Sequence, residues 1–306
     1  MNIFVTGATG FIGSAVVREL HAAGHQVRGL ARSESAASSL TAAGVEVQRG
    51  SLEDLDSLRR AAAASDGVIH LAYHHDFSEM QRAAQMDLNA VETIGAALAS
   101  TSKPFVIPTG TAMLTFFLPP GQVGTEQDLA PAEIQMSRIV SEKAMLALAQ
   151  RGVRASVIRL APTVHGEGDH GFVAALIQIA RAKGLSAYIG AGSNRWPAVH
   201  RLDAARLFRL ALEHAPAGSM LHGAAEEGIP MRAIAEVIGR HLNLPVVSIS
   251  PDQAGEHFGW LGTFLAIDNP ASSALTRERL GWHPAQPGLI ADLDQGHYFQ
   301  NGATHA

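Results

Sequence analysis

The sequence predicts an α/β fold built on a doubly wound parallel sheet, and three observations indicate it. Short apolar runs alternate with helical patterns through the first half of the 306 residues. A glycine-rich turn at residues 7–13 joins the first apolar run to the first helix. Hydrophobic residues make up 47% of the chain, enough to bury a parallel sheet on both faces.

Six apolar runs are expected to be strands of the N-terminal half, because each is short and bounded by turn-forming residues. They lie at residues 3–5, 27–30, 45–47, 68–72, 105–107 and 155–160. The first helix carries Ile12, Val16 and Leu20 on one face and stops at Gly24. Further helical patterns lie near residues 34–43, 54–64, 79–100 and 133–151, and right-handed crossovers are expected.

The pattern changes after Leu160, which predicts a second, smaller α/β lobe. A glycine-rich stretch at 165–171 precedes a helix near 172–183 and a strand at 187–189. Residues 199–222 return to a βαβ-like pattern, and a helix and a strand at 246–249 follow. We therefore expect one domain from 1–164 with 199–222, a substrate lobe from 165–198 and 223–306, and a cleft at the carboxyl ends of the strands.

Composition and charge exclude several classes of protein. The chain has no Cys, so disulfides, thiolate metal sites and a cysteine nucleophile are excluded. Its 23 Lys and Arg against 28 Asp and Glu disfavour nucleic-acid binding. No apolar run resembles a signal peptide or a membrane span, so we expect a soluble, cytoplasmic protein. His74, His75, His165 and His170 could bind zinc by residue type, but their spacing follows no ligand pattern and no metal is expected.

The glycine-rich turn between the first strand and the first helix predicts a pyrophosphate site. Three glycines allow a tight turn, close approach of a phosphate, and close packing of the helix on the strand. Backbone N–H groups and the positive end of the helix dipole face outward there. The residues expected to hold a dinucleotide are Gly7, Thr9, Gly10, Phe11, Ile12 and Gly13.

The spacing GxxGxxG resembles the extended branch of the short-chain dehydrogenase/reductase superfamily, whose members include NAD-dependent epimerases and dehydratases. Asn89 to Thr93 is similar to its NxxGT segment, with Glu92 in place of the glycine. Residues 199–205 are similar to its VHVDDLA segment, and residues 279–284 to its LGWxP turn. The resemblance covers nearly the whole chain. It implies a Rossmann fold, a nicotinamide cofactor and a homodimer formed through the helices near 79–100 and 133–151.

The end of the second strand favours NADP(H) over NAD(H). Ala31 stands where NAD enzymes carry the acid that binds the ribose hydroxyls. Arg32, with Arg28 as a second candidate, could bind a 2′-phosphate, although a solvated surface arginine is the alternative. The resemblance further implies a set of contacts: Ser51 and Leu52 to adenine, Leu71 and Ala72 beneath the dinucleotide, and Thr109, Pro162 and Val164 along its nicotinamide half.

The tyrosine of the family's proton relay is missing. The resemblance implies a Tyr and a Lys four residues apart on the helix near 133–151, with a Ser or Thr after the fifth strand. Thr111 matches that hydroxyl, but Lys143 has Ile139 four residues before it. If Ser141 sets the register instead, the two positions become Arg138 and Glu142.

Other side chains could replace the missing proton donor. Tyr73 and His75 directly follow the fourth strand, and His165 follows the sixth. The candidate catalytic residues are therefore Thr111, Lys143, Tyr73 and His75.

The expected cleft is mostly apolar, with only Arg195 and Arg201 available for a second pyrophosphate. Its wall is expected to include Phe77, Met113, Phe116, Phe117, Phe172, Trp196, Phe258 and Trp260. The sequence predicts an NADP(H)-dependent oxidoreductase that reduces a carbonyl or imine of a moderately bulky, largely apolar molecule. The alternatives are a catalytically inactive NADP(H)-binding sensor or scaffold, and a lyase or isomerase that uses the nucleotide transiently.

Overall fold

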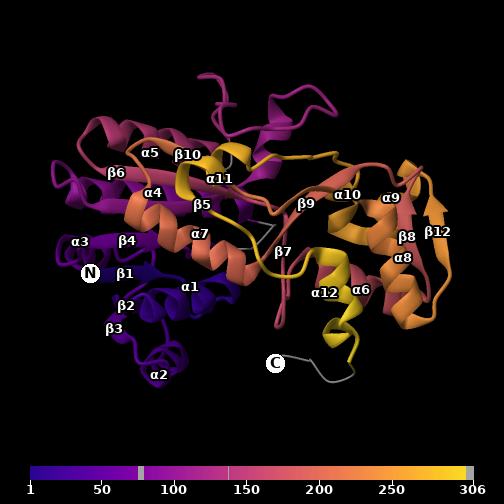
Figure 1. Ribbon diagram of the computed structural model, residues 1–306, viewed down its shortest axis with the longest axis horizontal. Helices are drawn as coiled ribbons and strands as arrows, with labels where there is room; N and C mark the ends of the chain where they lie inside the picture. Colours follow the sequence, from indigo (N-terminus) through magenta and orange to yellow (C-terminus); the bar gives the residue numbers. More distant parts are fainter. Residues whose placement is uncertain (75–78, 137, 301–306) are drawn as a thin grey trace.

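The computed structural model describes residues 1–74, 79–136 and 138–300 (Figure 1). Its largest sheet has seven parallel strands in the order β10-β6-β5-β4-β1-β2-β3. The strands are β1 (Asn2–Thr6), β2 (Gln26–Ala31), β3 (Glu46–Arg49), β4 (Gly67–His70), β5 (Pro104–Gly110), β6 (Arg154–Leu160) and β10 (Ser219–Gly223). The predicted doubly wound Rossmann sheet is therefore confirmed.

The chain order reverses between β1 and β4. From β1 the chain continues outward through β2 and β3, then returns to β4 and continues through β5 and β6 on the other side. Connections from two neighbouring strands leave in opposite directions at such a point, and a crevice opens at their carboxyl ends. The loop after β1 carries Gly7, and the loop after β4 carries Leu71 to His74.

Helices cover both faces of the sheet, because successive residues of each strand point to opposite sides. Ile3 and Val5 belong to one core, with residues of α1 (Phe11–Ala22), α2 (Glu34–Ala42) and α7 (Arg201–His214). Phe4 belongs to the other core, with residues of α3 (Leu55–Ala63), α4 (Met80–Leu98) and α5 (Ile139–Gln150). Figure 1 shows α1 and α7 side by side over the first of these faces.

Two small sheets and a third core make up the C-terminal elements, on the right of Figure 1. The strands are β7 (Thr163–His165), β9 (Arg195–His200) and β11 (Glu226–Pro230) in one sheet, and β8 (Ser186–Ile189) and β12 (Val246–Ile249) in the other. The α-helices of this part are α6 (Phe172–Lys183), α8 (Met231–Leu242), α9 (Ala254–Phe258), α10 (Gly262–Leu265) and α12 (Leu289–Asp294). Helix α11 (Ala274–Leu280) lies instead beside β10 of the large sheet. Short 3-10 turns are η2 (Thr111–Phe116), η3 (Pro251–Gln253), η4 (Gly259–Leu261) and η5 (His297–Phe299).

Strands β7 and β11 were not predicted from the sequence, and only the end of β9 falls within the predicted βαβ-like pattern of residues 199–222. Strand β9 is the central strand of its sheet although it contains Pro197, a residue that argues against a central strand. The pairing of β9 with β11 is irregular between Glu226 and Ile229, opposite the stretch from Ala198 to Trp196 that holds the proline. A bulge of this kind lets a strand accommodate a residue that has no N–H to donate.

The motif at residues 199–205 and the motif at residues 279–284 pack against each other. Trp282 is fully buried, and its indole N–H donates to the carbonyl of Asp203, 3.0 Å away. The Asp203 carboxylate accepts hydrogen bonds from the backbone N–H groups of Ala285 and Gln286, each at 3.0 Å. These contacts hold the turn after α11 on the first turn of α7.

Candidate functional site

The phosphate loop after β1 can be built only with glycine at two positions. Gly7 has a φ of 67°, and a Cβ atom there would lie 2.7 Å from the backbone nitrogen of Ala72. A Cβ atom at Gly13 would lie 1.9 Å from the carbonyl oxygen of Gly7. The start of α1 therefore packs directly on the loop, and the loop packs directly on the segment after β4.

The N-terminus of α1 offers an anion site. Its N-cap is Gly10, and no side chain of the described residues caps it. The N–H groups of Phe11, Ile12 and Gly13 in the first turn have no partner within the helix, and the helix dipole is positive there. With the glycine cradle, these donors fit the diphosphate of a dinucleotide, as the sequence predicts.

Arg32 is the cation available at the end of β2. It is exposed, and within the described ranges its guanidinium makes no hydrogen bond or ion pair. Arg28 is paired with Glu46 at 2.8 Å, and Arg49 is paired with Glu34 at 2.7 Å. Of these three arginines, Arg32 alone has no carboxylate partner among the described residues, so it is the one whose charge could bind a 2′-phosphate.

The other predicted cofactor residues line the same edge of the sheet or lie next to it. The N–H groups of Leu71 and Ala72 donate to the carbonyl and the hydroxyl of Thr6, at 3.2 and 3.1 Å. Ser51 accepts a hydrogen bond from the N–H of Glu53, and Leu52 packs against the core on the α3 face. Thr9 is exposed, whereas Pro162 and Val164 are half-buried at the start of β7. Their contacts with a cofactor stay predictions.

A buried polar chain runs from the phosphate loop to α4. The Thr6 hydroxyl lies 2.7 Å from Nδ1 of His70, and both residues have no exposed surface. His70 Nε2 lies 3.4 Å from Oδ1 of Asp87. A proton on Nε2 would face the carboxylate, in which case the Thr6 hydroxyl donates to Nδ1.

Asp87 anchors the start of α5. It accepts a hydrogen bond from the hydroxyl of Ser141 at 2.6 Å and from Nη2 of Arg138 at 3.2 Å. Burial raises the pKa of this carboxyl, but Arg138, His70 and Ser141 together outweigh burial and lower it to about 2. Asp87 was not predicted as a site residue. It lies on the apolar face of α4, between Ala83 and Val91, and a carboxylate at such a position indicates a buried polar partner.

Tyr73 lies against Arg138. The guanidinium carbon of Arg138 is 4.5 Å from the centre of the Tyr73 ring, the geometry of a cation–π contact. Burial raises the pKa of the Tyr73 phenol, Arg138 opposes that rise, and Asp87 adds to it. His75, the other candidate from this loop, lies outside the described residues.

Helix α5 places Glu142, not a lysine, in the buried position next to Ser141. The Glu142 carboxylate pairs with Arg159 on β6 at 2.6 Å and accepts a hydrogen bond from the hydroxyl of Thr109, also at 2.6 Å. Lys143 lies on a different side of the helix, where its ammonium donates to the carbonyls of Pro131, Ala132 and Ile134. Helix α5 also begins at Ile139, later than the predicted start near residue 133, and Lys143 holds the loop that precedes it.

Thr111 opens η2 and is fully buried, with its hydroxyl 3.0 Å from the side-chain amide of Asn269. In the amide orientation that satisfies every partner, the Asn269 oxygen accepts from the Thr111 hydroxyl and from the N–H of Ala112. Asn269 lies 158 residues further along the chain, and nothing in the sequence pattern predicted it. The roles of Thr111 and Lys143 in a reaction stay predictions.

His165 and His170, the other histidines considered as candidates, have protein partners. His165 Nδ1 lies 2.8 Å from Asp292, and the His165 ring contacts that of His200 edge-on. His170 contacts the ring of Phe11 on the phosphate loop. Throughout the described part of the chain, no group of three or more His, Asp or Glu is arranged to hold a metal ion.

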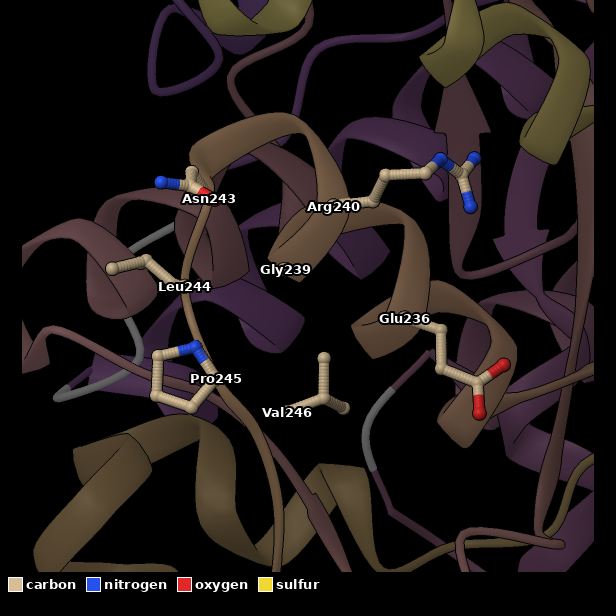
Figure 2. Close-up of a pocket in the computed structure, with 7 residues that line it drawn as sticks. All are labelled: Glu236, Gly239, Arg240, Asn243, Leu244, Pro245 and Val246. Atoms are coloured by element: carbon tan, nitrogen blue, oxygen red, sulfur yellow. The ribbon is translucent and has the colours of Figure 1, made fainter.

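One hollow of the surface lies away from this site. Figure 2 shows it beside the end of α8 and the start of β12, with a volume of about 570 Å³. Its lining residues are Glu236, Gly239, Arg240, Asn243, Leu244, Pro245 and Val246, none of which was predicted as a site residue.

In the described ranges, no helix combines the length and the apolar character needed to span a membrane.

Comparisons with known proteins give the same family as the motifs. The family described as NAD dependent epimerase/dehydratase matches residues 3–221. An uncharacterized protein of Schizosaccharomyces pombe is 52% identical over 299 residues, which cover 98% of this chain and all of that protein. The sterol-4-alpha-carboxylate 3-dehydrogenase of Dictyostelium discoideum is 27% identical over 248 residues, covering 76% of this chain and 73% of that enzyme.

Solved structures show the same fold across nearly the whole chain. The dTDP-glucose 4,6-dehydratase DesIV of Streptomyces venezuelae superposes with a TM-score of 0.76 at 17% identity, covering 98% of this chain and 97% of that one. The UDP-glucose 4-epimerase of Thermotoga maritima superposes with a TM-score of 0.76 at 21% identity and covers 98% of both chains. The chain therefore belongs to the NAD dependent epimerase/dehydratase family, within the extended short-chain dehydrogenases/reductases.

Proposed function

We propose that this protein is an NADP(H)-dependent oxidoreductase that reduces a carbonyl or imine group of a moderately bulky, largely apolar small molecule. The observation that carries the proposal is the glycine cradle beside an unpaired arginine. Gly7 and Gly13 let the loop pack directly on the segment after β4 and on the first turn of α1, whose N–H groups could bind a diphosphate. Arg32 is exposed without a partner in the described ranges at the end of β2. When bound, the reduced nicotinamide supplies the hydride.

The choice of NADP(H) rests on charge at the end of β2. An acid in the position of Ala31 would repel a 2′-phosphate, and the chain has none there. Arg28 and Arg49 are neutralised by glutamates, so the 2′-phosphate is assigned to Arg32. A charge-assisted hydrogen bond of this kind contributes about 1.5–3 kcal/mol, or roughly 10- to 100-fold in affinity.

An apolar substrate is supported by the aromatic cluster of the second lobe. The ring of Phe172 contacts those of Trp196, Trp260 and Phe264, and Trp260 is 49% exposed. Arg195 is bound to Asp268 at 2.9 Å, which removes one of the two cations that a second pyrophosphate would need. Relatives named for apolar substrates include a 2-alkyl-3-oxoalkanoate reductase of Stenotrophomonas maltophilia, 29% identical over 246 residues.

Two predicted catalytic residues take different roles in this proposal. Lys143 stabilises the loop before α5 through its three carbonyl partners. Thr111, buried against Asn269, orients the backbone where β5 ends rather than meeting solvent in the cleft. Small-molecule binding and a homodimer through α4 and α5 remain part of the proposal.

Cofactor titration tests the proposal directly. We expect the purified protein to quench its own tryptophan fluorescence or enhance that of NADPH on binding, and to bind NADPH more tightly than NADH. Arg32→Ala should weaken NADPH binding roughly 10- to 100-fold and leave NADH binding nearly unchanged. Arg60→Ala, which removes another exposed arginine on α3, is the matched control. Equal losses for both nucleotides in Arg32→Ala would remove the 2′-phosphate assignment.

Turnover separates the reductase from its alternatives. Consumption of NADPH is followed by absorbance with a panel of bulky ketones and imines. Oxidation of NADPH coupled to loss of the carbonyl or imine supports the reductase. Tight NADPH binding without turnover across the panel would favour the inactive sensor, and product formation without net NADPH oxidation would favour an isomerase or lyase.

A further inference from the structure

The start of α5 carries a cation where the family carries its phenol. In the register set by Ser141, the position of the family tyrosine is Arg138, and the phenol that lies against it comes from the loop after β4. We propose that the two groups have exchanged places: Tyr73 gives the proton to the substrate, and Arg138 is the cation that stabilises the phenolate. This inference rests on the proposed reductase function.

Tyr73 is held at the carboxyl edge of the sheet, next to the phosphate loop. Its neighbour Ala72 donates a backbone hydrogen bond to the Thr6 hydroxyl at 3.1 Å. A Cβ atom at Gly7 would lie 2.7 Å from the Ala72 nitrogen, so the two loops touch. The residue after Ala72 therefore starts from a backbone fixed against the loop that is proposed to hold the diphosphate. Tyr73 is half-buried, neither sealed in the core nor fully solvated.

Arg138 is fixed in place by a buried carboxylate. Its Nη2 donates to Asp87 at 3.2 Å, and Asp87 is itself held by Ser141 at 2.6 Å and faces His70 at 3.4 Å. The Arg138 side chain is only 14% exposed, so the charge that faces the Tyr73 ring is poorly screened by solvent. An arginine at an exposed position would exert a much weaker effect on a neighbouring phenol.

The surroundings of Tyr73 suit a proton donor. Burial favours the neutral phenol and raises its pKa, which keeps the proton in place at neutral pH. Among the described residues, Arg138 from the start of α5 and Asp87 from α4 are charged groups that act on it, and His70 on β4 adjoins Asp87. His74, next in the chain, lies 3.6 Å from Glu79. Arg138 favours the phenolate, so it stabilises the charge that develops as the proton leaves.

The proton and electron balance is complete. The phenolic O–H bond of Tyr73 breaks, and the substrate oxygen or imine nitrogen takes the proton. The adjoining carbon takes the hydride supplied by the reduced nicotinamide, so the substrate gains two electrons and two hydrogens. The Tyr73 phenolate then takes a proton from water, and Arg138 holds it in the interval.

The chain contains a matched control for this pair. Arg232 lies over the ring of Tyr188 at 5.6 Å and is paired with Glu236 at 2.8 Å, which repeats the phenol, cation and carboxylate combination at the surface. Only three tyrosines occur in the sequence, at positions 73, 188 and 298. Their signals can therefore be resolved and assigned by single Tyr→Phe substitutions.

The first experiment measures the phenol itself. The protein is labelled with 3,5-difluorotyrosine, whose phenol is more acidic, and the signal of residue 73 is titrated by ¹⁹F NMR. Arg138→Gln should raise the pKa of residue 73, because the opposing cation is gone, and Arg138→Lys should restore most of the effect. Arg232→Gln, which leaves the Arg138 contact intact, should leave the titration of residue 73 unchanged. An unchanged titration of residue 73 in Arg138→Gln would overturn the role of Arg138.

The second experiment measures the reaction. Tyr73→Phe should lower kcat roughly 10²- to 10⁴-fold, while the Kd for NADPH stays within about twofold. Tyr188→Phe should leave both unchanged. Since reduction needs the protonated phenol, activity falls as pH rises through its pKa, and Arg138→Gln should move that fall to higher pH.

The two proposals fail in different ways. Wild-type protein that binds no nicotinamide nucleotide would defeat the proposed function, whatever Tyr73 does. Wild-type protein that binds NADPH and turns over, with Tyr73→Phe equally active, would defeat only the exchange of roles. If Arg138→Gln unfolds because Asp87 loses its partner, Arg138→Lys and Tyr73→Phe still decide the question.

Discussion

Arg159 and Glu142 form a buried ion pair between β6 and α5, with Arg159 Nη2 2.6 Å from one carboxylate oxygen and Arg159 Nε 3.0 Å from the other. Arg159 is 1% exposed and also donates to the carbonyl of Asp128 at 2.8 Å. In the register set by Ser141, Glu142 stands at the position of the family lysine. In that register, the position of the family's relay lysine is part of a link between helix and sheet.

Removing one partner of this pair should cost far more than removing a surface pair. Glu142→Ala leaves the Arg159 charge buried without its carboxylate, and we expect the free energy of unfolding to fall by about 3–5 kcal/mol. Urea denaturation measures it. Glu34→Ala, which breaks the exposed pair with Arg49, should cost less than about 1 kcal/mol. Similar losses in the two variants would show that the Arg159 pair is not buried in solution.

A lysine at position 142 should not restore the family's relay. Glu142→Lys would place a second cation beside Arg159 and remove the acceptor of Thr109. We expect a larger loss of stability than for Glu142→Ala, without a gain in turnover. The departure from the family pattern is thus shared by at least two positions.

The sequence predicted the parts of the molecule that depend on local pattern. Strand alternation and the glycine spacing at Gly7 and Gly13 are short-range features, and they predicted the large sheet and its phosphate loop. Most of strand β9 was missed because Pro197 makes its own sequence unfavourable, and its neighbours β7 and β11 explain it. The same limit applies to the site.

The sequence could not show which polar residues, far apart along the chain, would become hydrogen-bond or ion-pair partners. Asn269 meets Thr111 only because the second lobe folds back on the end of β5. Arg159 and Asp87 could have been recognised as buried charges, since each lies within an apolar strand or helix face, but the sequence does not indicate which residue each one pairs with. The family's spacing makes Lys143 a candidate for the relay, but it does not predict the three loop carbonyls that its ammonium contacts before α5.

The phosphate loop allows a sharp test of the glycine cradle. In Gly13→Ala the added Cβ would lie 1.9 Å from the carbonyl oxygen of Gly7, and the clash involves backbone that cannot rotate away. We expect α1 to shift off the loop, NADPH affinity to fall by at least about tenfold, and the melting temperature to drop. Fluorescence titration and thermal unfolding measure the two effects.

The control for this change adds the same methyl group where nothing opposes it. A Cβ atom at Gly255, in α9, meets no atom within 4 Å, so Gly255→Ala should leave affinity unchanged and the stability equal or slightly higher. Wild-type affinity in Gly13→Ala would mean that the dinucleotide does not depend on the packing of α1 against the loop.

Acid should destabilise the protein in two separate pH ranges, and the upper one belongs largely to buried histidine. Burial lowers the pKa of His222 to about 4, with Arg159 acting in the same direction and Glu126 against it. A histidine in the unfolded chain takes up its proton near pH 6.5. Between those values the unfolded state holds more protons than the folded state, so the free energy of unfolding falls as pH falls.

The slope from one such group approaches about 1.4 kcal/mol per pH unit within that range and vanishes below it, where both states are protonated. Burial also lowers the pKa of His200, which adds to the same slope. Asp87 acts lower: its pKa of about 2 lies below the ordinary value of 3.8, so its contribution is present above pH 4 and is lost as pH falls toward 2. The two ranges can therefore be measured apart.

Urea unfolding at a series of pH values tests this assignment. His222→Gln should reduce the slope between pH 6.5 and 4 and leave the loss below pH 4 in place. His214→Gln, which changes a largely exposed histidine, should leave both ranges as they are in the wild type. If the slope above pH 4 persisted in full in His222→Gln, the buried histidine would have to take up its proton without unfolding, with Glu126 as the buried carboxylate beside it.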